Sequence, residues 1–294
     1  MNHDRLLVPA GKTIKLKDYD PAYTGKFSAK EDAAEKLQSD IAKLAALQDV
    51  LYAQNTYALL LIFQAMDAAG KDGVVKHVMS GVNPAGCQVV SFKTPSAEEL
   101  SHDYLWRSMK QVPARGHIGI FNRSYYEEVL VVRVHPEILR NQKIPPSLVG
   151  KDIWKERFEQ INAFEKYLTR NGTVILKFFL NISNKEQKKR FLERIDTPEK
   201  NWKFSSADVR ERAFWKDYMK AYEDIFSNTS TSWAPWHIIP ADRKWFTRTA
   251  VADIIVTTLE SLKLKYPAAD PEHLKGLREA RTALEGGHSS TKEI

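Results

Sequence analysis

Apolar residues fall along the chain in two patterns, short continuous runs and longer segments with helical spacing. The continuous runs predict five buried strands, at residues 57–65, 87–92, 117–122, 173–182 and 236–241. Helical spacing, with the turn and cap residues around it, predicts helices at residues 28–54, 71–79, 96–111, 151–171 and 243–264. Strands that alternate with helices in this way indicate an α/β fold, an open parallel sheet with helices on both faces.

The two ends of the chain differ from its middle. Residues 1–27 carry scattered Pro, Gly and Lys, and we expect them to form an arm on the surface. The helix that follows opens with Ser28 and Glu31, a capping-box pattern, so we expect a serine cap. The residues beyond Pro267 are polar and are expected to fray past Leu284. The predicted organisation is an arm at 1–27, a single domain at 28–270 and a tail at 271–294.

The segment between the fourth and fifth strands breaks the alternation. From Ser183 to Lys220 it holds eleven Lys or Arg residues against seven Asp or Glu residues in a mostly helical pattern. A charged helical excursion beside a ligand-binding loop is typical of a lid, which we place at about 183–230. A solvated helical hairpin would give the same pattern. The aromatic residues in this segment could stack on a base, or they could pack the lid itself.

Composition narrows the class of protein. With 294 residues, 43% of them hydrophobic, the chain can bury the core of one large or two small globular domains. The net charge of +7 favours a polyanionic partner and leaves nucleic acid, an acidic membrane surface and polyphosphate open, beside a protein that is simply basic. No run is long enough to span a membrane, and the N-terminus has no secretory pattern, so we expect a cytoplasmic protein. The single cysteine excludes an internal disulfide.

The stretch IFQAMDAAGKDGVVKHVM, residues 62–79, predicts a buried strand, a glycine-containing turn and a helix. The N–H groups of such a turn and of the helix N-terminus bind phosphate oxygens. The stretch departs from the G-x-x-x-x-G-K-[ST] pattern, with Ala65 in place of the first glycine and Asp72 in place of Ser or Thr. It is therefore a degraded loop, a coincidence, or a loop adapted to an unusual phosphate donor. The predicted phosphate-binding residues are Ala68, Ala69, Gly70, Lys71, Asp72 and Gly73.

Asp67 adds a negative charge where a phosphate-binding loop would ordinarily avoid one. That charge is tolerable beside phosphate if a cation lies between them. We therefore interpret Asp67 as a ligand of Mg²⁺, with Mn²⁺ as an alternative, or as a residue that orients the acceptor phosphate. Its alternative role is to cap the turn through its own side chain.

A second group of candidate residues follows the third strand, in IGIFNRSYYEEVLVVRVHP at 118–136. Because that strand ends at Asn122, Arg123 and Glu127 should lie at the carboxyl edge of the sheet, where ligands bind in such folds. Arg123 can hold phosphoryl oxygens through two hydrogen bonds, and Glu127 can position a metal or an arginine. Asn122 stands where a metal-directing acidic residue often follows the strand, so it is a candidate second metal ligand beside Asp67.

The basic excursion supplies a third group. Phosphoryl transfer is accelerated mainly by positioning and by cations that neutralise charge, and one mobile arginine can contribute ~10³-fold. A row of cations could also hold a long phosphate chain. The candidates for phosphate or polyphosphate binding are Arg133, Lys188, Lys189, Arg190, Arg194, Arg210 and Arg212.

Six blocks together resemble the polyphosphate kinase 2 family: FQAMDAAGKDGVVKHVMSGVNP, ELSHDYLWR, IGIFNRSYYEEVLVVRVHPE, ILKFFLNISNKEQKKRFLERI, NWKFSSADVRERAFWKDYMKAYED and PADRKWFTR. They cover residues 28–264 and follow the order of the family. The loop with Asp67 is the family's own form, so the resemblance implies that the loop is adapted and not degraded.

The resemblance implies a P-loop kinase fold close to thymidylate and adenylate kinases, with a five-stranded parallel sheet and a helical lid. It also implies Mg²⁺-dependent transfer of a terminal phosphoryl group between inorganic polyphosphate and nucleotides, namely AMP, ADP and ATP, with GDP and GTP as further substrates. Lys71 would hold phosphate, and Lys188, Arg190, Arg194, Arg210 and Arg212 would form the polyphosphate path and the lid. We expect no nucleic-acid or membrane partner and a homodimer or homotetramer.

Asn122 is a departure, because many members of the family have Asp there. The F-N-R-S form resembles the class III-like subgroup, which phosphorylates nucleoside monophosphates as well as diphosphates, AMP to ADP and ADP to ATP. One alternative is an ATP-dependent nucleoside or nucleotide kinase of the same fold, against which Ala65 and Asp72 stand. The other is a non-catalytic nucleic-acid-binding protein, although the sequence has no RNP-like strand or recognition-helix motif.

Overall fold

A computed structural model of the protein describes residues 1–286. The chain divides into a compact unit at Met1–Leu264 and a second unit that begins at Lys265. The described residues of the second unit include one helix, α11 at Pro271–Gly286. This helix extends past Leu284, where we expected the chain to fray. The rest of that expectation lies outside the described residues. No helix in the described part of the chain is both long and apolar enough to cross a membrane.

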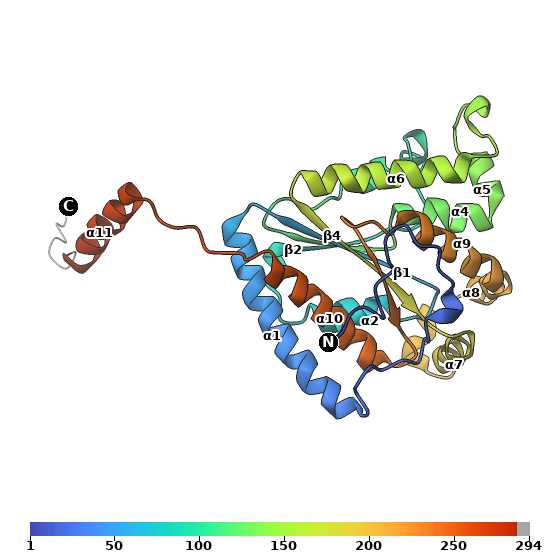
Figure 1. Ribbon diagram of the computed structural model, residues 1–294, viewed down its shortest axis with the longest axis horizontal. Coiled ribbons are helices and arrows are strands. Elements are labelled where there is room, and N and C mark those ends of the chain that lie inside the picture. The colour runs from blue at the N-terminus through green and yellow to red at the C-terminus, as the bar shows by residue number, and fades with distance from the viewer. Residues whose placement is uncertain (287–294) are drawn as a thin grey trace, which may run out of the picture. The chain divides into compact units, whose positions relative to one another are not determined.

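A parallel sheet forms the centre of the first unit (Figure 1). Its five strands lie in the order β2-β3-β1-β4-β5, with bounds β1 Ala58–Ala65, β2 Cys87–Ser91, β3 Ile118–Asn122, β4 Thr173–Asn181 and β5 Trp236–Pro240. The eight residues of central β1 are all buried, as the continuous apolar run requires of a strand covered on both faces. The predicted strands and the α/β class are confirmed. In the register, Phe63 pairs with Asn122 on one side, which brings the ends of β1 and β3 together.

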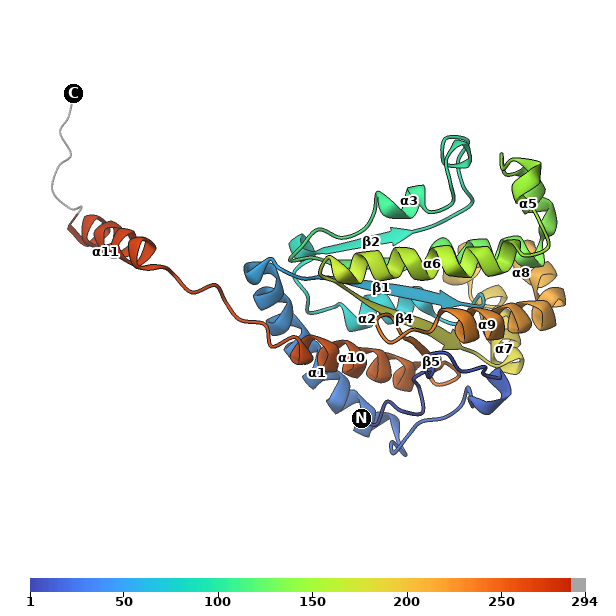
Figure 2. The same cartoon turned by 45° about the horizontal axis from the view of Figure 1, so that its top comes forward.

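Helices cover both faces of this sheet. Helices α1 and α10 pack together on one side, and α6 lies on the other (Figures 1 and 2). The bounds are α1 Lys30–Gln54, α2 Lys71–Val78, α3 Trp106–Met109, α4 Val131–Val134, α5 Pro136–Asn141, α6 Ile153–Arg170, α7 Asn184–Ile195, α8 Ser206–Glu211, α9 Trp215–Thr229 and α10 Lys244–Ser261. Four of the five predicted helices are present as α1, α2, α6 and α10. Their ends lie within a few residues of those expected.

The helix predicted at residues 96–111 is wrong. The chain there forms only the 3₁₀ helix η3, Glu99–Ser101, and the one-turn helix α3. Side chains take the backbone groups that a helix would use: Ser96 and Glu99 bond each other's main-chain N–H, and the Asp103 carboxylate accepts from the N–H of Leu105. The predicted serine cap of α1 is also wrong, because Ala29 occupies the cap position and makes no side-chain bond.

The N-terminal arm belongs to the core, contrary to the surface position expected for it. Leu6 and Val8 are buried, and their backbones pair antiparallel with β5, Val8 N–H to the carbonyl of Trp236 at 2.9 Å and Ile238 N–H to that of Leu6 at 2.7 Å. The arm therefore covers the outer edge of β5, a row of groups that would otherwise be free to pair with another chain. Just before these residues, the ring of His3 forms a hydrogen bond of 2.6 Å with the carboxylate of Asp253, a buried residue of α10.

The predicted lid is shorter than residues 183–230. Helix α9, in its second half, packs against the sheet: the ring of Tyr222 lies 4.2 Å from that of Phe179 on β4, and Phe226 lies 5.1 Å from it. The elements between β4 and α9 contribute no residue to the main hydrophobic core; they are α7, the 3₁₀ helix η6 at Pro198–Lys203, α8 and the 3₁₀ helix η7 at Arg212–Phe214. Trp202, a candidate for base stacking, is 78% exposed.

Candidate active site

The loop between β1 and α2 has the geometry of an anion-binding turn. Ala68 and Gly70 both take left-handed backbone conformations, with φ of 63° and 107°. Gly70 adopts this freely, whereas Ala68 is strained there, and such strain concentrates at functional sites. The turn leads directly into the N-terminus of α2 at Lys71. Its N–H groups and the helix dipole thus favour a phosphate group at this position, which stays the prediction for this loop.

Lys71 lies folded into this loop. Its ammonium donates a hydrogen bond to the carbonyl of Ala65 at 3.0 Å, across the six residues of the turn. Burial, with the nearby positive charge of Arg123, lowers the pKa of Lys71 to about 8. The ammonium is therefore available to a phosphate group at neutral pH, and a bound negative charge would restore its pKa.

Arg190 holds the loop through hydrogen bonds to the carbonyls of Ala68 and Ala69. Its side chain is 4% exposed, and all five of its N–H donors are used within the protein. Their acceptors are the carboxylate of Glu186 and the carbonyls of Ala68, Ala69, Ala241 and Asp242, at 2.6 to 3.3 Å. Arg190 therefore fixes the loop to the residues that follow β5, and its place on the polyphosphate path stays a prediction.

Arg212 is placed in a similar way. It donates to the backbone carbonyl and side chain of Asn184 and, at 2.6 Å, to the amide oxygen of Gln187. Gln187, which is buried, in turn donates to the main-chain carbonyl of Asp67 at 2.9 Å. Arg212 therefore connects the α8 region to the loop through α7, and its contact with polyphosphate stays a prediction.

Arg123, Glu127 and Asp67 come together as the sequence predicted. The guanidinium of Arg123 contacts the carboxylate of Asp67 at 2.9 Å and that of Glu127 at 3.3 Å. The charge of Glu127, with that of Asp67, raises the pKa of Arg123 above its ordinary value. Arg123 also has a left-handed backbone, with φ of 64°, which a non-glycine residue adopts at a cost. The strained turn directs this cation to the mouth of the loop.

Two residues that depart from the usual patterns, Asn122 and Asp72, are hydrogen-bonded to each other. The amide nitrogen of Asn122, at the end of β3, donates to the carboxylate of Asp72, in the first turn of α2, at 2.7 Å. The residue that replaces the usual Ser or Thr is thus bound to the residue that replaces the usual Asp. This leaves the amide oxygen of Asn122 as the group that could face a metal beside Asp67. Among residues 1–286 no three His, Cys, Asp or Glu side chains gather in a way that could hold a metal alone.

A basic cavity of about 230 Å³ opens on the other side of the loop. Ala68, Ala69, Gly70 and Gly73 form one wall, and Glu193 is the one acidic side chain among the lining residues. Six cationic side chains line it: Arg190, Arg194, Lys200, Lys203, Lys244 and Arg248. Burial, and then the charge of Arg190, lower the pKa of Lys244, and burial lowers that of Arg248. Such a concentration of positive charge suits a polyanion.

The cations around this cavity are only partly those predicted. Arg194 lines it, whereas Lys188 and Lys189 are exposed on α7, Arg210 is exposed on α8, and none of these three is among its lining residues. Arg133 donates to Asp224 on α9 at 2.5 Å. Lys203 lines it too and belongs to the predicted basic excursion, whereas three lining cations were missed: Lys200, Lys244 and Arg248. The last two lie four residues apart on α10, so helical spacing after PADR was the signal that could have found them.

A buried network supports the turn that carries Glu127. This turn is the 3₁₀ helix η4, Tyr125–Val129. The hydroxyls of Tyr125 and Tyr126 both donate to Glu165, at 2.9 and 2.8 Å, and the fully buried ammonium of Lys177 donates to the other carboxylate oxygen at 2.6 Å. With every charge paired, the network gives η4 one position on the sheet.

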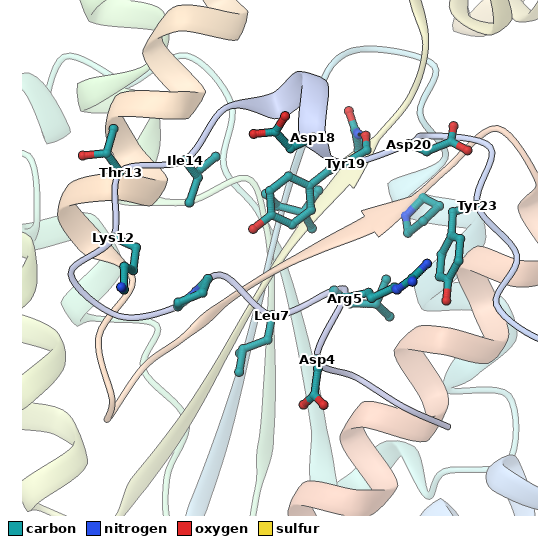
Figure 3. Close-up of a pocket in the computed structure, with 15 residues that line it drawn as sticks. Asp4, Arg5, Leu7, Lys12, Thr13, Ile14, Asp18, Tyr19, Asp20 and Tyr23 are labelled. Carbon is teal, nitrogen blue, oxygen red and sulfur yellow. Dashed lines mark hydrogen bonds between the residues drawn. The ribbon is translucent and has the colours of Figure 1, made fainter.

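A separate cavity of about 530 Å³ lies under the N-terminal arm (Figure 3). The arm from Asp4 to Tyr23 supplies most of its lining, with Asn181, Ile238 and Pro240 from the strand ends. The guanidinium of Arg5 lies over the ring of Tyr23, 5.7 Å from its centre. This cavity shares no lining residue with the basic cavity, and none of the predicted site residues lines it.

A loop from the central parallel strand, a lysine at the start of the next helix and an arginine held between two carboxylates define a phosphotransferase of the P-loop kinase class. Comparison with known proteins gives the family. The chain belongs to the polyphosphate kinase 2 family, whose model matches residues 27–267.

Three similar proteins place the chain within this family. The ADP-polyphosphate phosphotransferase of Rhodopseudomonas palustris is 52% identical over 94% of this chain and 96% of its own length. The AMP/ADP-polyphosphate phosphotransferase of Meiothermus ruber is 45% identical over 88% of this chain and 93% of its own. The crystal structure of polyphosphate kinase 2 from Arthrobacter aurescens matches with a TM-score of 0.83 and 42% identity, covering 93% of this chain and 98% of that one. The resemblance stated from the sequence and the P-loop kinase fold are confirmed.

Proposed function

We propose that the protein is a polyphosphate-dependent nucleotide kinase, which transfers the terminal phosphoryl group of inorganic polyphosphate to ADP and to AMP. The observation that carries this proposal is the basic cavity on the loop, with six cationic side chains and one acidic one. A nucleotide kinase that uses ATP needs to neutralise three phosphates, whereas this row of cations suits a longer chain. The two relatives from R. palustris and M. ruber, named for polyphosphate, support the same donor.

The residues divide the work of an in-line transfer between them. The loop N–H groups and Lys71 hold the phosphoryl group that moves, and Arg194, Lys244 and Arg248 hold the rest of the donor chain. An oxygen of the acceptor's terminal phosphate attacks the end phosphorus, and the bond from that phosphorus to its bridging oxygen breaks. The shortened chain leaves with the electron pair, and the transfer is reversible. Arg123 stabilises the charge on the moving group by binding its oxygens.

Mg²⁺, with Mn²⁺ as an alternative, fits the carboxylate of Asp67 and the amide oxygen of Asn122. Mg²⁺ takes few protein ligands and completes its shell with water and substrate phosphates, so one carboxylate and one amide oxygen form a reasonable partial site. When bound, the ion would neutralise charge between donor and acceptor phosphates. Asp67 would then release part of its contact with Arg123, which leaves the guanidinium free for phosphate.

The use of AMP as well as ADP rests on Asn122. Asn122 itself is a neutral amide where many members of the family have a carboxylate, and it donates a hydrogen bond to the nearby charge of Asp72, so an acceptor phosphate meets less negative charge than with Asp at this position. The M. ruber relative, named for both acceptors, supports this part of the proposal. We also propose GDP and GTP as substrates, a homodimer or homotetramer, and a cytoplasmic location.

The test is ATP formation from purified protein, polyphosphate and Mg²⁺, with ADP and with AMP as acceptors in parallel. ATP from both acceptors is expected. ATP from ADP alone would remove the second acceptor and keep the donor. No ATP from either, with phosphorylation of AMP or dTMP by ATP in place of polyphosphate, would favour the ATP-dependent kinase. Chelation of the metal should abolish turnover in the first assay.

A further inference from the structure

Tyr222 on α9 carries a buried hydroxyl that has no hydrogen-bond partner among residues 1–286. The residue is 1% exposed, and its ring packs between Phe179 on β4 and Phe226 on its own helix, with ring centres 4.2 and 5.7 Å away. A phenylalanine would fill the same space and leave no buried donor unsatisfied. Because buried polar groups in folded proteins are nearly always bonded, this hydroxyl calls for an explanation.

The charged groups of the candidate active site act on this hydroxyl. Burial raises the pKa of Tyr222, and the largest charge effect on it comes from Glu127, followed by that of Arg123. The influence is mutual, since Tyr222 is among the groups that act on the pKa of Arg123. Helix α9 packs against α4 and α6, and both of these helices also contact the turn that carries Glu127. The orphan hydroxyl therefore belongs to the layer that surrounds this turn, close enough to feel the charges of Glu127 and Arg123.

Tyr218, one turn earlier on α9, is a useful comparison because its hydroxyl is bonded whereas that of Tyr222 is not. The two side chains share a helix face, and Tyr218 is also buried and influenced by the charge of Glu127. Its hydroxyl, however, donates to Glu211 at 2.7 Å. Of these two tyrosines, only Tyr222 keeps its donor free.

The balance of charge around Arg123 indicates what the free donor is for. Arg123 is shared by the carboxylates of Asp67 and Glu127, and the side chain of Glu127 is only 16% exposed. When Arg123 takes hold of a phosphoryl group, Glu127 loses part of its neutralising partner in a place with little water. A carboxylate there needs another donor to remain in position.

We propose that Tyr222 is a positioning residue whose hydroxyl donates to Glu127 while Arg123 binds the moving phosphoryl group. The bond holds Glu127 in place, and Glu127 keeps Arg123 aimed at the transition state. This role rests on the proposed kinase function. It predicts an effect on turnover and little effect on substrate binding, because the hydroxyl is needed only when Arg123 is engaged.

The experiment compares Tyr222→Phe with wild type in ATP formation from polyphosphate and ADP, with thermal unfolding of both. We expect kcat to fall about tenfold to a hundredfold, the range for a hydrogen bond to a charged group, with both KM values within about twofold. Tm should stay the same or rise, since an unsatisfied buried donor is removed. Tyr218→Phe is the control: it should lower Tm, because its bond to Glu211 is lost, and change kcat by less than about threefold.

A double-variant cycle tests whether the hydroxyl acts through Glu127. If it does, Tyr222→Phe added to Glu127→Gln should lower kcat by much less than it does alone. Equal falls in the two backgrounds would overturn the proposal, as would a Tyr222→Phe enzyme with wild-type kcat. A wild-type enzyme that forms no ATP would refute the kinase function, and the positioning role with it, whereas an active wild type with an equally active variant refutes the positioning role alone.

Discussion

Replacing Arg190 with lysine separates two roles that the positive charge alone cannot distinguish. Arginine and lysine carry the same charge, so a residue that attracts polyphosphate through charge should tolerate the change. A residue that holds five acceptors through a planar fork should not, because lysine has only three donors. In the structure Arg190 bonds Glu186 and four carbonyls, two of them in the loop at Ala68 and Ala69.

The size of the effect follows from the number of bonds lost. Lysine leaves at least two of the five acceptors without a donor, in a place where the side chain is 4% exposed. At about 1 to 1.5 kcal/mol for each buried bond, the free energy of unfolding should fall by about 2 to 3 kcal/mol. For a unit of this size, that corresponds to a Tm lower by about 5 to 10 °C. The loop carbonyls also lose their support, so kcat should fall at least about tenfold.

The assay is thermal unfolding of the purified variant, with KM for polyphosphate and kcat measured well below the new Tm. Arg194→Lys is the matched control, because Arg194 lines the same cavity but makes only long contacts, 3.4 Å to the carbonyl of Lys203 and 3.8 Å to Asp208. The control should keep its Tm within about 2 °C. If Arg190→Lys kept the wild-type Tm and kcat and raised only KM for polyphosphate, Arg190 would contact the donor and the assignment to the loop would be refuted.

Four further results are expected. Asp67→Asn and Lys71→Ala should each lower kcat at least about a hundredfold with unchanged far-UV circular dichroism, and a variant with most of its activity would remove that residue from the chemistry. Because the pKa of Lys71 is lowered to about 8, the ammonium of the empty enzyme loses its charge as the pH rises above 8. KM for polyphosphate should therefore climb between about pH 8 and 10. A flat profile would contradict the assignment of Lys71 to phosphate binding. Lys244→Ala with Arg248→Ala should raise KM for long polyphosphate at least about tenfold and reduce its salt dependence, while KM for ADP stays within about twofold. Although burial acts to raise it, hydrogen bonds from neighbouring cations hold the pKa of Asp253 well below its usual range. Its contribution to stability is therefore fully present above the unfolded pKa and is lost as the pH falls through the folded one. Asp253→Asn should cost about 3 kcal/mol at pH 7 in urea unfolding, and this cost should begin to shrink below about pH 4 and vanish only as the pH passes the folded pKa.

The site residues that closely follow a strand in the sequence were predictable from the sequence alone. Gly70 and Lys71 follow a buried strand directly, and Arg123 follows another, so the parallel sheet alone brings them to one edge. The roles of Arg190 and Arg212 were not predictable, because a count of charges does not tell whether a side chain faces solvent or a row of carbonyls. Residues that are far along the chain from the loop were missed for a related reason.

Lys244 and Arg248 illustrate this second limit. They lie more than 170 residues after the loop, and only the strand order, with β4 between β1 and β5, brings the start of α10 beside it. The broken helix at residues 96–111 has a local cause of another kind. There the polar side chains that usually cap helices close single turns instead, and the spacing of apolar residues cannot tell these outcomes apart.

The pairing of the arm with β5 has a consequence for how the chain is made. The partners of Leu6 and Val8, namely Trp236 and Ile238, are synthesised about 230 residues after them. At roughly 5 to 20 residues per second, translation separates them by about 10 to 50 s. During that interval the arm has no strand to join, and its apolar residues are open to chaperones and to other nascent chains. The arm is therefore made long before it can dock, and the edge of β5 is closed only when the arm returns to it.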